Sequence, residues 1–215
     1  MTRTRNAKMS GPTIFWEVDV QSDFMLRGGK LYVPGADKII PNIQRLVGAA
    51  SSSRTFIVSS ACSHTEHDPE FQQFPPHCIR GTAGQRVIPE GLAQDFITIP
   101  NDGSPLPTDA LSRRQVVIEK QVLDVFSNPR AGEIVERLGA DVEFVVFGVV
   151  TEYCVNLAAK GLLARGRKVA IVRDAIETLA ANAGQRTLAD LTACGARLIS
   201  TSDALALVTK SHAAR

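Results

Sequence analysis

Short, mostly apolar stretches recur along the chain and alternate with longer segments of helical periodicity. The apolar stretches cover residues 13–20, 54–61, 114–120, 143–150 and 167–174. They are nearly continuous runs of Val, Ile and Phe, which is typical of strands that are covered on both faces of a parallel sheet. The segments between and after them predict helices over 36–49, 129–139, 154–165, 182–194 and 203–209.

This alternation predicts an α/β fold, a three-layer Rossmann-like sandwich with a mostly parallel six-stranded sheet flanked by helices. A chain of 215 residues that is 44% hydrophobic suits one domain with its own core. We expect that domain to span 13–209, between flexible tails at 1–12 and 210–215. Residues 63–91 break the alternation, because they are rich in Pro, His, Gly and charge and are longer than a usual connection. Such a segment is usually functional.

Charge and apolar length restrict the class of partner. The formal net charge is +2, and the basic residues form no run beyond the start of the chain at 2–8. This pattern gives no electrostatic footprint for nucleic acid or for an anionic membrane. Apolar runs of roughly 20 residues, as needed to cross a bilayer, are absent, and no apolar segment follows the basic start. We therefore expect a cytoplasmic protein that acts on a small molecule.

Polar residues follow several of the predicted strands at the point where each one ends. They are Asp19, Cys62 with His64, Lys120, and Thr151, Glu152 and Cys154. Ligands of open α/β sheets bind beyond the carboxyl ends of the strands. These residues should therefore meet at one edge of the sheet. The four cysteines, at 62, 78, 154 and 194, form no CxxC pair and are expected to be reduced thiols.

Three of these residues suit nucleophilic catalysis, and each also has an ordinary structural interpretation. Cys154 stands where a helix should begin, and the N–H groups and dipole there lower the pKa of a thiol. Asp19 should be partly removed from water, which suits a group that takes and gives a proton. Lys120 would stabilise the anionic forms of both. Alternatively, Cys154 packs as a small apolar residue, Asp19 caps a turn, and Lys120 reaches solvent.

Four motifs occur in order along 13–205: "VDVQSDFMLRGGKLYVPGAD", "FPPHCIRGTAGQ", "IEKQVLDVFSN" and "FGVVTEYCVNLAA". With them the chain resembles the cysteine hydrolase family of nicotinamidases, N-carbamoylsarcosine amidases, ureido-amide hydrolases and isochorismatases. The resemblance implies that Asp19, Lys120 and Cys154 form a catalytic triad. It implies hydrolysis of an amide or ureide through a thioester on Cys154.

The same resemblance implies roles for residues around the triad. A cis peptide is expected between Val149 and Val150, so that the N–H groups of Val150 and Cys154 form an oxyanion hole. Phe24 and Phe74 match positions that flank the substrate, and Gln21, which lies close to the triad aspartate, is also expected to bind the substrate.

Nicotinamidases of this family bind a divalent metal through an Asp-x-His pair and the His of the Pro-His-Cys block. The matching residues here are Cys62, His64 and His77, so the resemblance places a cysteine where an aspartate is usual. A thiolate with two imidazoles suits Zn²⁺ better than Mn²⁺ or Mg²⁺. His67 could complete the set or lie on a solvated turn. The alternative is that the metal was lost and the histidines form hydrogen bonds at the pocket rim.

The leading hypothesis is an amidohydrolase that releases ammonia from a nicotinamide-like amide or from a ureide or carbamoyl amide. Isochorismatases commonly lack the cysteine, so Cys154 favours the amidase branch. The alternatives are an isochorismatase-like hydrolase of another small substrate and a non-catalytic redox or binding relative, the latter suggested by Cys62 and Cys154 at one sheet edge. We expect no nucleotide or organic cofactor, and a homo-oligomer, since family members are commonly dimers or tetramers.

Overall fold

A computed structural model describes residues 12–53 and 55–213. The elements follow the chain in this order: β1 (Thr13–Val18), α1 (Ser22–Met25), α2 (Ala36–Ser53), β2 (Ile57–Cys62), η1 (Pro69–Gln72), η2 (Pro89–Gly91), β3 (Phe96–Ile99), η3 (Ala110–Ser112), β4 (Gln115–Lys120), η4 (Val125–Ser127), α3 (Pro129–Arg137), β5 (Glu143–Gly148), η5 (Thr151–Val155), α4 (Asn156–Ala164), β6 (Lys168–Ile176), α5 (Ala181–Ala193), β7 (Arg197–Ile199) and α6 (Thr201–Ala213).

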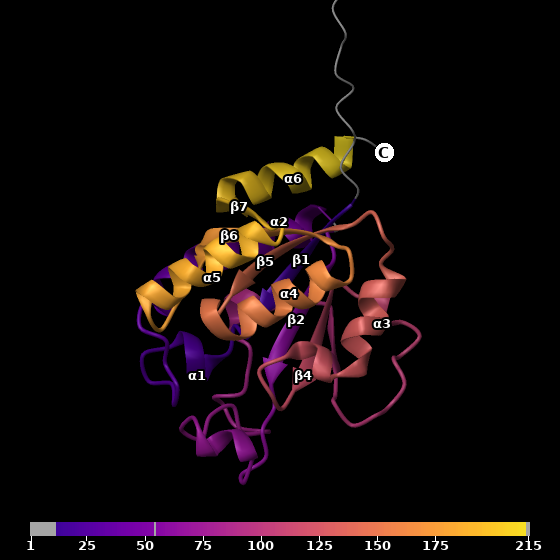
Figure 1. The fold of residues 1–215 in the computed structure, drawn as a ribbon. Helices are drawn as coiled ribbons and strands as arrows, with labels where there is room; N and C mark the ends of the chain where they lie inside the picture. The colour runs from indigo at the N-terminus through magenta and orange to yellow at the C-terminus, as the bar shows by residue number, and fades with distance from the viewer. Residues whose placement is uncertain (1–11, 54, 214–215) are drawn as a thin grey trace, which may run out of the picture.

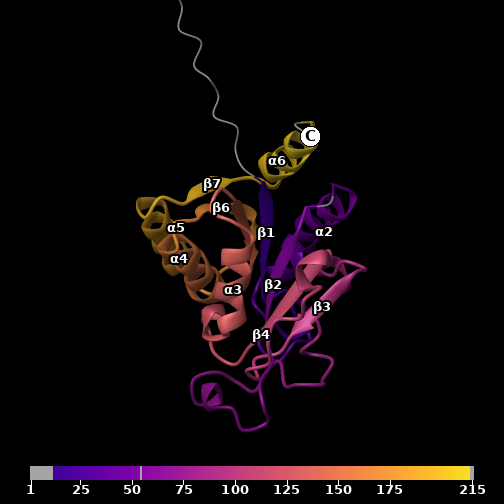
Figure 2. The same cartoon turned by 90° about the vertical axis from the view of Figure 1, so that its right-hand side faces the viewer.

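The described strands form one parallel sheet in the order β3-β4-β2-β1-β5-β6-β7. Helices α2 and α6 cover one face, and α3, α4 and α5 cover the other, as the edge-on view in Figure 2 shows. The predicted three-layer α/β architecture is therefore confirmed. The sheet has seven strands where six were expected. The apolar runs missed β3 and β7 because these edge strands are short and only Ile99 and Ile199 in them are buried.

The central strand β1 shows why the sequence gives this sheet. All its residues are buried, and consecutive side chains enter opposite apolar layers. Phe15 packs with the α2 and α6 side, whereas Trp16 packs with the α3, α4 and α5 side. A strand that is apolar on both faces is stable only between two layers of helices.

The helices agree with the predicted ones apart from their ends. Helix α4 begins at Asn156, because residues 151–155 form a separate π-helical turn, η5. Helix α6 starts at Thr201 and ends at Ala213, so 210–213, expected in a tail, continue it. The predicted tail at 1–12 lies outside the described residues apart from Pro12. No described helix is long and apolar enough to cross a membrane.

The long segment 63–91 lies beyond the end of β2, at the far end of the sheet from α6 (Figure 1). It is held there by contacts with the start of the chain. The buried carboxylate of Asp23 accepts hydrogen bonds from the N–H groups of Cys78 (2.7 Å) and Lys30 (2.9 Å). The segment therefore covers the carboxyl ends of the central strands, where the candidate site lies.

Candidate active site

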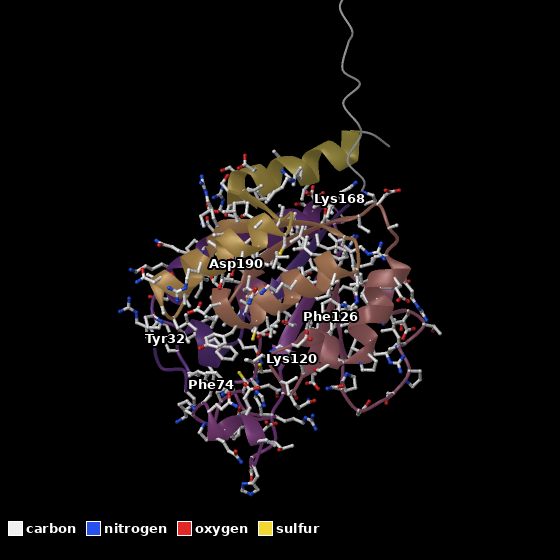
Figure 3. All side chains as sticks on the ribbon, viewed as in Figure 1. Tyr32, Phe74, Lys120, Phe126, Lys168 and Asp190 are labelled. Atoms are coloured by element: carbon white, nitrogen blue, oxygen red, sulfur yellow. The ribbon has the colours of Figure 1, made fainter. Side chains whose placement is uncertain are left out.

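Asp19, Lys120 and Cys154 come together at the carboxyl end of the sheet. The Nζ atom of Lys120 lies 2.9 Å from Oδ2 of Asp19 and 3.6 Å from Sγ of Cys154. The same Nζ atom lies 3.0 Å from Sγ of Cys62. Figure 3 labels Lys120 and Phe74 at this end of the molecule. The cation at the end of β4, the carboxylate just after β1 and the thiol in the connection after β5 therefore lie close together.

Asp19 is fixed by its neighbouring strand. Its backbone has φ of 50°, a left-handed conformation that few residues other than glycine adopt. Its N–H donates to the carbonyl of Ser60 (3.1 Å), and Ser60 Oγ donates to Asp19 Oδ1 (2.7 Å). This turn directs the carboxylate at Lys120 instead of along the strand.

Cys154 is positioned by the connection that follows β5. The expected cis peptide between Val149 and Val150 is present. Gly148 just before it has φ of 115°, and a Cβ there would lie 2.1 Å from the carbonyl oxygen of Val18. Only glycine allows β5 to end this close to β1. The chain then enters η5, which carries Cys154 towards Lys120.

Burial governs the ionisation of the thiol and of the amine. Burial raises the pKa of Cys154 well above its usual value, and the negative charge of Asp19 raises it further. The prediction that the helix start lowers this pKa is therefore wrong, because the thiol is buried beside a carboxylate. Burial opposes the charge of Lys120, but Asp19, Cys154 and Cys62 outweigh it and raise the Lys120 pKa. Lys120 is thus charged, and Cys154 is a thiol that needs a base.

The three expected metal-binding side chains also converge. Ligand atoms of Cys62, His64 and His77 lie within 4.8 Å of one another, and all three residues are buried. Both ring nitrogens of the fully buried His64 lack a hydrogen-bond partner, although Nδ1 lies 3.1 Å from a carboxylate oxygen of Asp68. Buried imidazole nitrogens without partners are suited to a metal, and one thiolate with two imidazoles is a zinc-type donor set. The residues therefore fit Zn²⁺.

The rest of this cluster differs from the sequence prediction. His67 is exposed and lies outside the group of three. Glu70 is there instead, because its Oε1 lies 3.8 Å from Nε2 of both His64 and His77. Burial raises the pKa of Glu70. Sequence reasoning missed Glu70 because it lies inside the irregular segment, where its only signal was membership of 63–91.

A narrow cavity opens beside the triad. Its volume is about 30 Å³. Asp19, Cys62, Glu70, His77 and Cys154 line it, together with a mainly apolar wall of Phe24, Leu31, Val33, Phe74, Leu123, Val149, Val150, Tyr153 and Leu179. The cavity therefore suits a small apolar or flat molecule.

Two of the three expected substrate contacts line this cavity, and the third does not. Phe24 and Phe74 are part of its wall. Gln21 is fully buried behind it, where its amide donates to the carbonyl of Cys62 (2.8 Å) and accepts from the N–H of Cys62 (2.7 Å). Its side chain therefore holds the end of β2 in place and does not reach a bound molecule.

A family model described as the Isochorismatase domain matches residues 14–99 and 92–203. The chain belongs to the isochorismatase family. It is thus an isochorismatase-family hydrolase.

The chain is also similar to several solved structures. The chain is 26% identical to a pyrazinamidase of Pyrococcus horikoshii in complex with zinc, covering 88% of this chain and 99% of that one, with a TM-score of 0.71. It shares its fold with a pyrazinamidase/nicotinamidase from Streptococcus mutans UA159 (24% identity, 87% and 99% covered, TM-score 0.72). The fold also matches an N-carbamoylsarcosine amidase from Thermoplasma acidophilum (22% identity, 89% and 97% covered, TM-score 0.69). No curated protein matches the chain.

In this member of the isochorismatase family, Glu152 positions part of the cavity wall. Its Oε1 accepts hydrogen bonds from the N–H groups of Leu179 (3.0 Å) and Ala180 (2.9 Å), and its Oε2 accepts from Thr178 Oγ1 (2.6 Å). One carboxylate thus fixes the turn after β6, from which Leu179 faces the cavity.

Proposed function

We propose that this protein is a cysteine-dependent amidohydrolase that cleaves a small amide to an acid and ammonia. The observation that carries the proposal is the shared contact of Lys120 Nζ with Asp19 (2.9 Å) and Cys154 (3.6 Å), next to a narrow, mainly apolar cavity. A base, a cation and a nucleophile within reach of one another are the parts that acyl transfer requires. Membership of a hydrolase family supports the same reaction class.

The first half-reaction forms a thioester. Asp19 takes the proton of the Cys154 thiol as the sulfur attacks the amide carbonyl carbon. The oxyanion that develops accepts hydrogen bonds from the N–H groups of Val150 and Cys154. Asp19 then gives its proton to the amide nitrogen, the C–N bond breaks, and ammonia leaves.

The second half-reaction releases the acid. Water attacks the thioester carbonyl while Asp19 takes a proton from it, and the C–S bond breaks. The thiolate of Cys154 regains the proton from Asp19, and the carboxylic acid leaves. Throughout, the ammonium of Lys120 offsets whichever of Asp19 and Cys154 is negative, which matters in a buried site where an unpaired charge is costly.

We further propose that Cys62, His64 and His77 hold Zn²⁺. When bound, the ion supplies a Lewis acid that holds a lone pair of the substrate and so orients it. The donor set, the buried Nε2 of His64, which has no hydrogen-bond partner, and the zinc complex of the Pyrococcus horikoshii pyrazinamidase support this assignment. Loss of the metal, with the imidazoles left as hydrogen-bonding groups, is the alternative.

The aromatic and apolar wall favours nicotinamide as the first compound to try, ahead of linear ureides. We also propose that the protein acts in the cytoplasm as a homo-oligomer, as is common among its relatives, and that its partner is a small-molecule amide.

Ammonia release from nicotinamide, N-carbamoyl amino acids, biuret-like ureides and maleamate tests the proposal. Wild type and Cys154→Ala are compared, with Cys194→Ala as the matched control because that thiol is exposed. We expect Cys154→Ala alone to abolish turnover. Activity that survives this substitution would instead support an isochorismatase-type reaction. A reversible response to oxidant with no ammonia from any compound would support a redox or binding relative.

A further inference from the structure

The groups around the active-site cavity present no positive charge to a bound molecule. Of the described residues that line the cavity, none is Lys or Arg. Lys120 lies behind the wall with no exposed surface, and its Nζ contacts Asp19, Cys62 and Cys154. An ammonium group has three N–H donors. With three partners already in contact, Lys120 has no donor left for a carboxylate on a substrate.

The two other polar side chains in the cavity wall, His77 and Glu70, offer acceptors. His77 Nδ1 lies 2.8 Å from the carbonyl oxygen of Pro75. A carbonyl only accepts, so Nδ1 carries the proton and Nε2 of the neutral ring is an acceptor. Oε1 of Glu70 lies 3.8 Å from Nε2 of His77. Neither the ionised nor the protonated form of Glu70 supplies a positive charge.

An outer groove that adjoins the cavity also lacks positively charged lining residues among those described. Glu70, Phe74 and Leu123 line both the cavity and an outer groove of about 530 Å³. The groove adds the carboxylates of Asp68 and Asp124, and none of its described lining residues is Lys or Arg. A path lined by one sign of charge lowers the local concentration of molecules of that sign.

From these observations we infer that the cavity takes amides whose body is uncharged or positively charged and rejects amides that carry a carboxylate. Glu70 is the specificity-determining residue, because it is the carboxylate that both the cavity and its approach share. The inference rests on the proposed function, since the reacting amide must point at Cys154 and its body at Glu70. It concerns the protein without a bound metal, because a divalent ion held by Cys62, His64 and His77 would itself place a positive charge beside Glu70.

Three benzamides that differ only at ring position 3 test the inference. They are benzamide, 3-(aminomethyl)benzamide and 3-carbamoylbenzoate, assayed for kcat/KM with chelator-treated protein. Juxtaposed like charges are strongly unfavourable, so 3-carbamoylbenzoate should be at least about tenfold poorer than benzamide. Glu70→Gln should reduce this difference in kcat/KM between the two compounds. Glu66→Gln removes the same charge from an exposed position of the same segment and should leave the difference unchanged.

Binding of the three compounds to Cys154→Ala, measured by calorimetry, gives a readout that needs no turnover. The same order of affinity is expected there. The inference is overturned if wild type cleaves or Cys154→Ala binds 3-carbamoylbenzoate within about threefold of benzamide. It is also overturned if Glu70→Gln leaves the ratio unchanged, or if none of the three compounds binds. If the order of binding holds but no compound releases ammonia, the proposed function fails while the charge selectivity stands.

Discussion

Lys120 Nζ lies closer to Cys62 Sγ (3.0 Å) than to Cys154 Sγ (3.6 Å). The ammonium group of Lys120 thus contacts two thiols and one carboxylate, that of Asp19, and all four side chains are buried. Burial raises the pKa of Cys62 to about 12, an effect that Lys120 opposes. The candidate metal ligand and the candidate nucleophile therefore share a single cation.

Replacing Lys120 with methionine should cost both stability and activity. Removing one partner of a buried ion pair leaves Asp19 as an unpaired charge, which costs roughly 3–5 kcal/mol. Chemical denaturation should show this loss, and ammonia release should fall by at least about a hundredfold. Lys160→Met, at an exposed position, is the control. If Lys120→Met folds too poorly to assay, Lys120→Arg keeps the charge and should recover part of the stability. Normal turnover by Lys120→Met would contradict the proposed role of Lys120.

Metal content should depend on the buried cluster and not on the exposed histidine. We expect Cys62→Ala and His77→Ala to lower the zinc content of the purified protein, measured by elemental analysis, and His67→Ala to leave it unchanged. Cys62→Asp replaces a soft ligand with a hard one and should shift the preference from zinc towards manganese. Equal zinc content in wild type and Cys62→Ala would exclude Cys62 as a ligand.

The turn that carries Leu179 should loosen when Glu152 is shortened. Glu152→Ala removes the acceptor of two N–H groups and of one hydroxyl group. Because Leu179 forms cavity wall and does no chemistry, KM should rise by about tenfold while kcat changes less. Glu152→Gln retains an acceptor and should have a smaller effect. A fall in kcat at unchanged KM would instead indicate a part in the chemical step.

Stability should fall as the pH rises through the range in which Glu17 ionises. Burial raises the pKa of Glu17 to about 8, although Ser59 donates a hydrogen bond to its Oε2 (2.7 Å). A carboxyl whose pKa is raised by folding stabilises the protein fully below its unfolded pKa of about 4.3, and this stabilisation is lost as pH rises towards 8.

The measurement is the free energy of unfolding of wild type and Glu17→Gln between pH 5 and 9. The difference should move in favour of Glu17→Gln as pH rises, by about 1.4 kcal/mol per unit at most below pH 8. For Glu136→Gln, at an exposed position, the free energy of unfolding should change with pH in parallel with that of wild type. Parallel curves for Glu17→Gln would show that Glu17 is not the titrating group.

The sequence by itself determined the layers of the fold and which polar residues meet at one edge of the sheet. Buried parallel strands must be apolar on both faces, so β1, β2, β4, β5 and β6 are visible as runs of Val, Ile and Phe. The residues that end such strands meet at one edge by the geometry of the sheet, which predicts that Asp19, Lys120 and Cys154 lie together, as they do in the structure. Their role as a catalytic triad is implied by the resemblance to the cysteine hydrolase family and stays a prediction.

Tertiary structure alone decided what depends on packing between distant segments. The edge strands β3 and β7 are short and little buried, so they carry no apolar run. Glu70 reaches the histidines only because 63–91 folds over the strand ends, and Gln21 turns away from the cavity because it holds β2. The raised pKa of Cys154 is set by its burial beside Asp19, a property of the surroundings that no local pattern encodes.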